Sequence, residues 1–149
     1  MRKMKMGKVT FTEAYKAVNE YRQKFPQKAV TFYAQNYPAM GWAVFMAGGS
    51  CPVIPCTDKA FLKDAAAMEV EETNTDEYKK MVKSDIGSII YSKSGTEIPV
   101  QLSSGKYVLK YIHPASGKIE TINKSLKING LYNLKVPDKK EGIYWFHKL

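Results

Sequence analysis

Long apolar runs and export signals are missing from this 149-residue sequence. It contains no stretch of about 18 consecutive apolar residues, which predicts that no helix spans a membrane and that no membrane is a partner. The basic residues 1–8 are followed by Thr10, Thr12 and Glu13 instead of an apolar segment, so they do not form a signal peptide. As it stands, the chain is expected in the cytoplasm.

Cysteine is scarce, with only Cys51 and Cys56 present. In an extended segment these two residues would lie about 16 Å apart, whereas a disulfide requires Cα atoms within about 7 Å. Neither His113 nor His147 stands at a zinc-ligand spacing from them. We therefore expect two buried thiols, no metal and no cofactor.

Arginine is absent beyond Arg22, although the formal net charge is +9. Arginine is the usual two-pronged reader of guanine and phosphate, so its scarcity argues against nucleic-acid binding. The lysines are mostly single and spread along the chain, giving net charges of +3 for residues 1–75 and +6 for residues 76–149. We expect a solvated lysine-rich surface and no nucleic-acid partner.

Motifs of common catalytic chemistry are missing as well. Gly48-Gly49 ends an apolar helical stretch instead of opening a helix after a strand, so no phosphate-binding loop is predicted. The acidic residues 69–77 lack the ligand spacing and the glycine of a calcium loop. Asp58 and Asp64 are better explained as a helix cap and part of a solvated helix face than as an acid pair. His113 precedes a proline in a predicted turn and is expected to be exposed.

Three helices are predicted in the first half, over residues 10–25, 39–47 and 58–68. The first opens with a capping box formed by Thr10 and Glu13. The second is apolar on every side, and the third is capped by Thr57 or Asp58.

Two apolar stretches, residues 28–34 and 50–55, lie between these helices and are predicted to be strands. The resulting order α-β-α-β-α is typical of parallel α/β architecture. A helix without a polar face must be covered all round, and strands with continuous apolar runs belong to sheets buried on both faces. Because two strands and three helices cannot provide that cover, we expect residues 28–68 to belong to a larger α/β body.

The second half has a different character. Residues 70–77 form an acidic linker, and residues 78–149 contain short alternating apolar runs separated by glycine-containing turns, which predicts an antiparallel β-sandwich. The predicted fold class is therefore α+β. An incomplete parallel α/β segment over residues 1–69 is joined through the linker to the sandwich.

Several segments carry a family resemblance. Residues 41–55 and Phe61 to Ala65 resemble the end of glycoside-hydrolase-like (β/α)8 barrels from bacterial polysaccharide-degrading proteins. Gly105 to Lys118 and Gly142 to Phe146 resemble the collagen-binding-type β-domain that follows such barrels, except that His113 stands where the family has Asp or Asn. The resemblance implies that residues 28–68 are β7-α7-β8-α8 of the barrel, a TIM-barrel tail, and that the parent protein is extracytoplasmic or periplasmic.

The resemblance also locates candidate site residues. Barrel active sites lie at the C-terminal ends of strands, and glycoside hydrolysis usually requires two carboxylates. Such barrels carry one carboxylate at the end of strand seven, where this chain has Gln35 and Asn36, which can bind a sugar but cannot act as nucleophile or acid. We therefore predict no enzymatic activity. Tyr144 and Trp145 are candidates for sugar stacking, with a place in the core as the favoured alternative.

Two functions are compatible with these observations. The first is a non-catalytic accessory β-domain that stabilises or orients the rest of a barrel. The alternative is an autonomous carbohydrate- or protein-binding β-sandwich module. The first predicts self-association of the isolated chain through its apolar elements, and the second predicts saturable polysaccharide binding.

Overall fold

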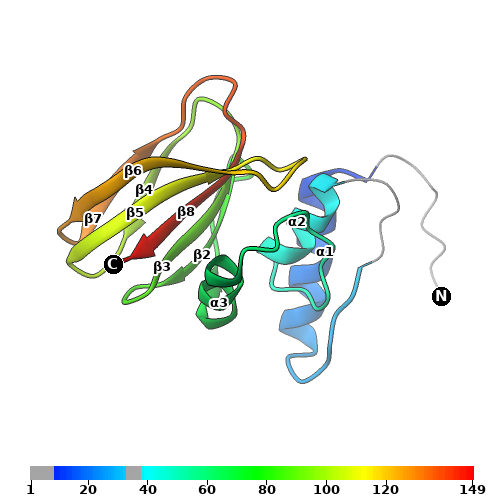
Figure 1. Cartoon of the computed structure of the whole chain (residues 1–149). Coiled ribbons are helices and arrows are strands. Elements are labelled where there is room, and N and C mark those ends of the chain that lie inside the picture. The colour runs from blue at the N-terminus through cyan, green and yellow to red at the C-terminus, as the bar shows by residue number, and fades with distance from the viewer. Residues whose placement is uncertain (1–8, 33–37) are drawn as a thin grey trace. The chain divides into compact units, whose positions relative to one another are not determined.

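The computed structural model describes residues 9–32 and 38–149, and its contacts divide the chain into two compact units, Met1–Val53 and Ile54–Leu149 (Figure 1). The first unit contains helices, and the second contains one helix and all the strands of the described residues. The fold is α+β, and every strand pair in it is antiparallel.

Helix α1 (Phe11–Lys24) begins at the capping box that the sequence predicts. The Thr10 side chain accepts a hydrogen bond from the Glu13 amide, and the Glu13 carboxylate accepts one from the Thr10 amide at 2.8 Å. This pairing satisfies amides that the first turn of a helix leaves without partners. The helix buries Ala14, Tyr15 and Val18.

Helix α2 (Pro38–Met46) is covered within this chain, contrary to the expectation from its sequence. Every residue from Trp42 to Ala47 is at most 7% exposed. Part of the cover comes from α1, because Val18 of α1 and Val44 of α2 both lie against Gly49. A Cβ added at Gly49 would be 2.5 Å from a methyl of Val44 and 3.0 Å from a methyl of Val18. An apolar surface all round this helix therefore does not require a larger body to bury it.

Neither of the two predicted parallel strands forms in the described residues. Residues 28–32 and 50–55 have no strand structure, and residues 33–34 lie outside the described part. Pro52 and Pro55 have no amide to donate to a sheet, and Cys51 has a positive φ of 53°, which interrupts an extended strand. The two segments do meet at one point, where the Ser50 amide donates to the Val30 carbonyl at 2.7 Å.

The second unit begins with helix α3 and continues with eight strands, whose bounds are α3 (Lys59–Ala67), β1 (Glu69–Glu71), β2 (Tyr78–Lys83), β3 (Gly87–Ser92), β4 (Glu97–Gln101), β5 (Gly105–Ile112), β6 (Ile119–Ile128), β7 (Leu131–Lys135) and β8 (Gly142–Lys148). Six strands form one sheet in the order β1-β2-β3-β8-β5-β6, and β4 and β7 form a second sheet. These are the two layers of the predicted sandwich (Figure 1).

The core of the sandwich consists of inward-facing residues of both sheets, as alternation along each strand predicts. The members of this core are Ile90, Ile98, Val100, Leu102, Tyr107, Leu109, Tyr111, Ile128, Leu134, Val136, Tyr144 and Phe146. The central strands β3 and β8 are buried on both faces, because Ile89 and Trp145, which point away from this core, are also fully buried. Trp145 packs against Phe61 of α3 at a ring-centroid distance of 5.3 Å.

The segment predicted as an acidic linker is part of the second unit. Residues 69–71 form strand β1, and the Glu71 carboxylate pairs with Lys80 of β2 at 2.9 Å. Thr73 donates to the Tyr78 carbonyl at 3.1 Å. The boundary between the units therefore falls before α3, at residue 53, and not within residues 70–77.

None of the described helices is long and apolar enough to cross a bilayer.

Candidate functional site

Two of the four candidate sugar-binding residues, Tyr144 and Trp145, are buried in the structure. Tyr144 and Trp145 are 1% and 0% exposed, so neither ring face is available for stacking on a sugar. Both side chains lie in a central strand that is covered on both sides, which explains why an aromatic pair ends up in the core. Gln35 and Asn36 lie outside the described residues.

A buried polar junction links helix α3 to strand β8. Its members are Phe61, Asp64, Trp145 and His147, and we call this group the α3–β8 joint. Asp58 caps the helix by accepting a hydrogen bond from the Phe61 amide at 2.8 Å. With the helix fixed in this way, Phe61 and Asp64 are three residues apart and face the same side.

Asp64 is the centre of the α3–β8 joint. Its Oδ2 accepts hydrogen bonds from Trp145 Nε1 at 2.9 Å and from His147 Nδ1 at 2.7 Å. Among the described residues it is the only buried carboxylate, and its two partners are the compensation that a buried charge requires. The sequence predicts Asp64 on a solvated helix face, and this prediction is wrong because Asp64 is buried. The signal available in the sequence was its spacing of three from Phe61.

The Asp64–His147 pair has the geometry that orients an imidazole in many enzymes. An ionised carboxylate only accepts hydrogen bonds, so Nδ1 of His147 is the donor to Asp64. Nucleophilic catalysis would also need a hydroxyl or thiol on Nε2. Among the described residues no hydroxyl or thiol is bonded to Nε2, and the contacts of the α3–β8 joint hold helix α3 against strand β8.

The Trp145 ring has a cation on its face. The Lys110 ammonium of β5 lies 4.3 Å from the ring centroid, within the range of a cation–π contact. The indole therefore contacts α3 through Phe61 and Asp64 and contacts the neighbouring strand through Lys110. Trp145 and His147 together therefore join the helix to the sheet.

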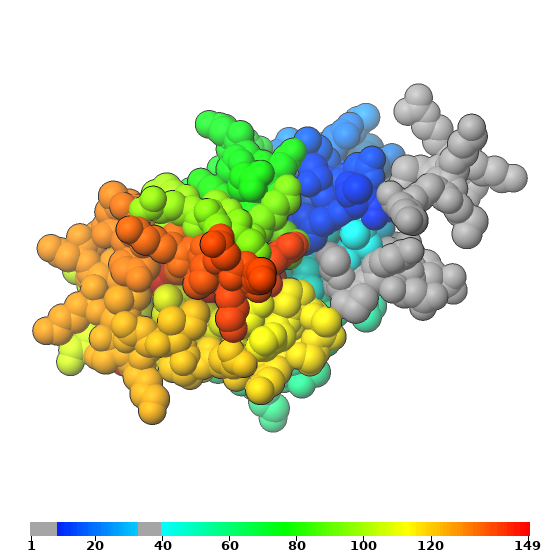
Figure 2. Space-filling model, turned by 90° about the horizontal axis from the view of Figure 1, so that it is seen from above, coloured from blue at the N-terminus to red at the C-terminus, as the bar shows by residue number. Residues whose placement is uncertain are grey.

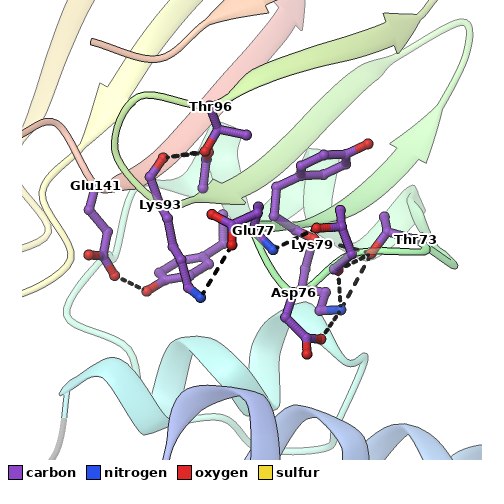
Figure 3. Close-up of polar contacts among 11 residues, drawn as sticks. Thr73, Asp76, Glu77, Lys79, Lys93, Thr96 and Glu141 are labelled. Carbon is purple, nitrogen blue, oxygen red and sulfur yellow. Dashed lines mark hydrogen bonds and ion pairs between the residues drawn. The ribbon is translucent and has the colours of Figure 1, made fainter. Parts of the chain in front are cut away.

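A second polar network surrounds the start of β2 (Figure 3). The Lys79 ammonium is buried and donates to the Thr75 carbonyl at 2.8 Å and to Asp76 at 3.2 Å. Glu77 pairs with Lys93 at 3.9 Å, and the Tyr91 hydroxyl donates to the Glu141 carboxylate. Burial, together with that carboxylate, raises the pKa of Tyr91. These contacts tie the turn before β2 to the sheet.

A third group lies at the β5–β6 turn, and we call it the turn cluster: Tyr111, His113, Glu120 and Lys140. His113 Nε2 lies 2.9 Å from a Glu120 oxygen, and Lys140 lies 3.6 Å from the other oxygen and 4.8 Å from the centre of the Tyr111 ring. The β5–β6 turn and the 137–141 loop are therefore adjacent, as the yellow and red-orange residues of Figure 2 show. His113 is half-buried and paired, and not simply exposed as expected.

The charges of the turn cluster affect its titrating groups. The hydrogen bond from His113 lowers the pKa of Glu120, and Lys140 and Lys118 act in the same direction. Burial raises the pKa of Tyr111, and burial raises the pKa of Tyr144 to about 12. The phenols are neutral hydrogen-bond donors at ordinary pH, with Tyr111 donating to the Glu141 carbonyl at 2.8 Å.

The two thiols differ from each other. Both cysteines are free, but Cys51 is exposed and only Cys56 is buried, so the expectation of two buried thiols was half right. Burial raises the pKa of the Cys56 thiol. Within the described residues, no three His, Cys, Asp or Glu side chains are grouped so that they could hold a metal ion.

Comparisons with known proteins add the following findings. A family model described as a domain of unknown function, DUF6298, matches residues 1–68. No curated protein matches the chain. A solved structure titled glycoside hydrolase is similar at 15% identity, with a TM-score of 0.40, over 53% of this chain and 19% of that one.

Two structures of CapF are also similar to the chain. One is CapF with the inhibitor 3-isopropenyl-tropolone, at 11% identity and a TM-score of 0.23, over 92% of this chain and 44% of that one. The other is the capsular polysaccharide assembling protein CapF from Staphylococcus aureus, at 11% identity and a TM-score of 0.23, over 98% of this chain and 64% of that one. The chain thus spans from about a fifth to just under two thirds of these proteins. No TM-score among them reaches 0.5, so these likenesses assign neither fold nor function.

Proposed function

We propose that this chain is the non-catalytic C-terminal part of a glycoside-hydrolase-like carbohydrate-active protein, in which the β-sandwich holds and orients the end of a (β/α)8 barrel. The observation that carries the proposal is the α3–β8 joint. Helix α3 is the segment whose sequence resembles the last barrel helix, yet it belongs to the same compact unit as the sandwich. A sandwich that holds this helix would fix the end of the barrel in place.

The first unit supports a barrel origin through one contact. Neighbouring strands of a barrel are parallel and hydrogen-bonded to each other. The hydrogen bond from Ser50 to Val30 joins the two segments that the resemblance identifies as strands seven and eight. In the complete barrel, further strands would supply the partners that extend this single bond into a ladder.

We infer a non-catalytic role from the carboxylates of the chain. Hydrolysis of a glycoside usually needs two carboxylates on either side of the bond. Asp64, the buried carboxylate of the described residues, is held by Trp145 and His147. At the predicted end of strand seven the chain has Gln35 and Asn36, whose amides do not take part in such chemistry.

Limited proteolysis of the full chain with proteinase K tests the proposed role of α3. We expect a resistant fragment that begins within residues 50–58 and retains α3, because the exposed Val53 marks the boundary and α3 is joined to the sheet. The ends of the fragment are read by mass spectrometry. In an Asp64→Ala variant α3 should be lost, so that the fragment begins after Met68, and the matched Asp85→Ala variant should behave as wild type. A wild-type fragment that already begins after Met68 would contradict the proposal.

A further inference from the structure

The β5–β6 hairpin carries an excess of positive charge that its own carboxylate does not balance. Residues 105–128 contain five lysines and one acidic residue, Glu120. Glu120 is occupied at the turn cluster by His113, Lys118 and Lys140. The lysines at the other end of the hairpin are therefore without a counter-charge from this hairpin.

Three of these lysines lie on one face of the sheet, which we call the lysine face: Lys106, Lys110 and Lys127. The register places Lys106 directly opposite Lys127, and residues directly opposite in a sheet point to the same side. Lys110 follows Lys106 by four residues along β5, whose pairing with β8 has an unbroken register, and therefore shares that side. Lys106 and Lys127 are exposed, and neither has an ion pair in the part of the chain that the structure describes.

The pairing of Lys106 with Lys127 destabilises the ligand-free sheet, because like charges directly opposite each other in a sheet repel. An anion placed between the two ammonium groups would remove this repulsion. The adjoining part of β6 is exposed over residues 121–125. Thr121 stands directly opposite Lys110, and Ser125 comes two residues before Lys127, so both hydroxyls lie on the side of the lysines. Cations beside hydroxyl groups suit a ligand that carries both negative charge and many hydroxyls.

We propose that the lysine face binds an acidic polysaccharide, one whose sugar units carry carboxylates. Nucleic acid fits this surface less well, because single strands stack on exposed rings and the tyrosines of β5, Tyr107 and Tyr111, are buried. The choice of a polysaccharide over other polyanions rests on the proposed carbohydrate-related function. The surface itself does not involve the α3–β8 joint beyond the contact of Lys110 with Trp145.

Isothermal titration of the full chain with oligogalacturonate at low and at moderate salt tests this proposal. We expect saturable binding that weakens with salt, and no binding of the fully methyl-esterified form, which has the same sugar chain without the charge. The double variant Lys106→Gln/Lys127→Gln should lose about tenfold in affinity. The matched double variant Lys63→Gln/Lys135→Gln, with the same net charge and both changes at exposed lysines elsewhere, should stay within about twofold. Thermal melts of both variants establish that they are folded.

Several results would overturn the proposal: no heat with oligogalacturonate, equal loss in both double variants, equal binding of the esterified form, or binding of poly-glutamate or single-stranded DNA as tight as that of oligogalacturonate. The last result would assign the surface to polyanions in general. None of these outcomes alters the proteolytic fragment that contains α3, so failure here is distinct from failure of the proposed accessory role.

Discussion

At the scale of single residues, Asp64 contributes more to this protein than its sequence context suggests. A carboxylate in the middle of a nine-residue helix is usually solvated. Here it is buried because its partners, Trp145 and His147, are 81 and 83 residues away along the chain. Periodicity within a helix shows which side faces inward, but it carries no information on a donor so distant in sequence.

The Asp64→Ala variant should destabilise the second unit by about 2 kcal/mol, because the indole N–H of Trp145 would stay buried without an acceptor. An Asp64→Asn variant keeps one acceptor oxygen and should lose about half as much. The midpoint of urea unfolding, followed by tryptophan fluorescence, measures both changes. If Asp64→Ala shifts stability no more than the exposed control Asp85→Ala, which should stay within about 0.5 kcal/mol, the joint is not stabilising.

Tyr144 and Trp145 illustrate a related limit. Alternation along a strand distinguishes a buried from a solvated face only when one face is solvated. Strand β8 lies between β3 and β5, and both of its faces are covered. A pair of neighbouring aromatic residues in such a strand is therefore compatible with a binding platform at the sequence level, although both side chains belong to the interior.

At the scale of elements, the sequence predicted well whatever depends on local chemistry. The capping box, the cap at Asp58 and the antiparallel strands with glycine turns of the second half are where the patterns indicated. Strands β1 and β2 were missed because their sequences are rich in Glu and Lys, and Lys79 and Lys80 are buried only through specific pairing. The two predicted parallel strands failed because a strand exists only with a hydrogen-bonded neighbour.

The β5–β6 turn provides a test at this scale. Gly117 has a φ of 70°, and a Cβ at this position would lie 2.6 Å from the Pro55 carbonyl oxygen. Gly117→Ala should therefore lose about 2 kcal/mol or more, through both backbone strain and collision with the segment before α3. Gly95→Ala is a matched control, since its φ is 69° but its Cβ would come only within 3.1 Å of a side-chain oxygen of Asp138.

Thermal unfolding by circular dichroism measures both glycine variants. The Gly95 variant should show the backbone cost alone, about 1 kcal/mol. An equal loss of stability in the two variants would mean that the segment at Pro55 moves aside at no cost. The close contact of the turn with this segment would then not contribute to stability.

At the scale of the whole molecule, the boundary between the units lies before α3 and not at the predicted linker. The change of composition near residue 70 indicated a domain border there, but compactness follows contacts and not composition. Because α3 belongs with the sheet, the second unit is a sandwich with a helix attached, and the first unit is a helical pair with extended segments. The barrel segment predicted for residues 1–69 is thus divided between the two units.

Assays with a panel of aryl glycosides should give no turnover above the buffer blank at any pH from 4 to 8. The reason is that hydrolysis usually needs two carboxylates, whereas Asp64, the buried carboxylate of the described residues, is held by Trp145 and His147. A glycoside hydrolase assayed in parallel is the positive control, because it shows that the substrates are intact. Release of nitrophenol by the purified chain, retained after a further purification step, would contradict the proposal of an accessory role.

The position of β8 has a consequence for how the protein is made. Its residues 142–148 come last among the strands, yet they lie between β3 and β5, which have no direct pairing with each other. Until these residues leave the ribosome, the sheet can form only as two separate parts, β1-β2-β3 and β5-β6, each with an unpaired edge strand. A nascent chain halted before residue 142 would therefore be a natural client for chaperones that shield unpaired strands.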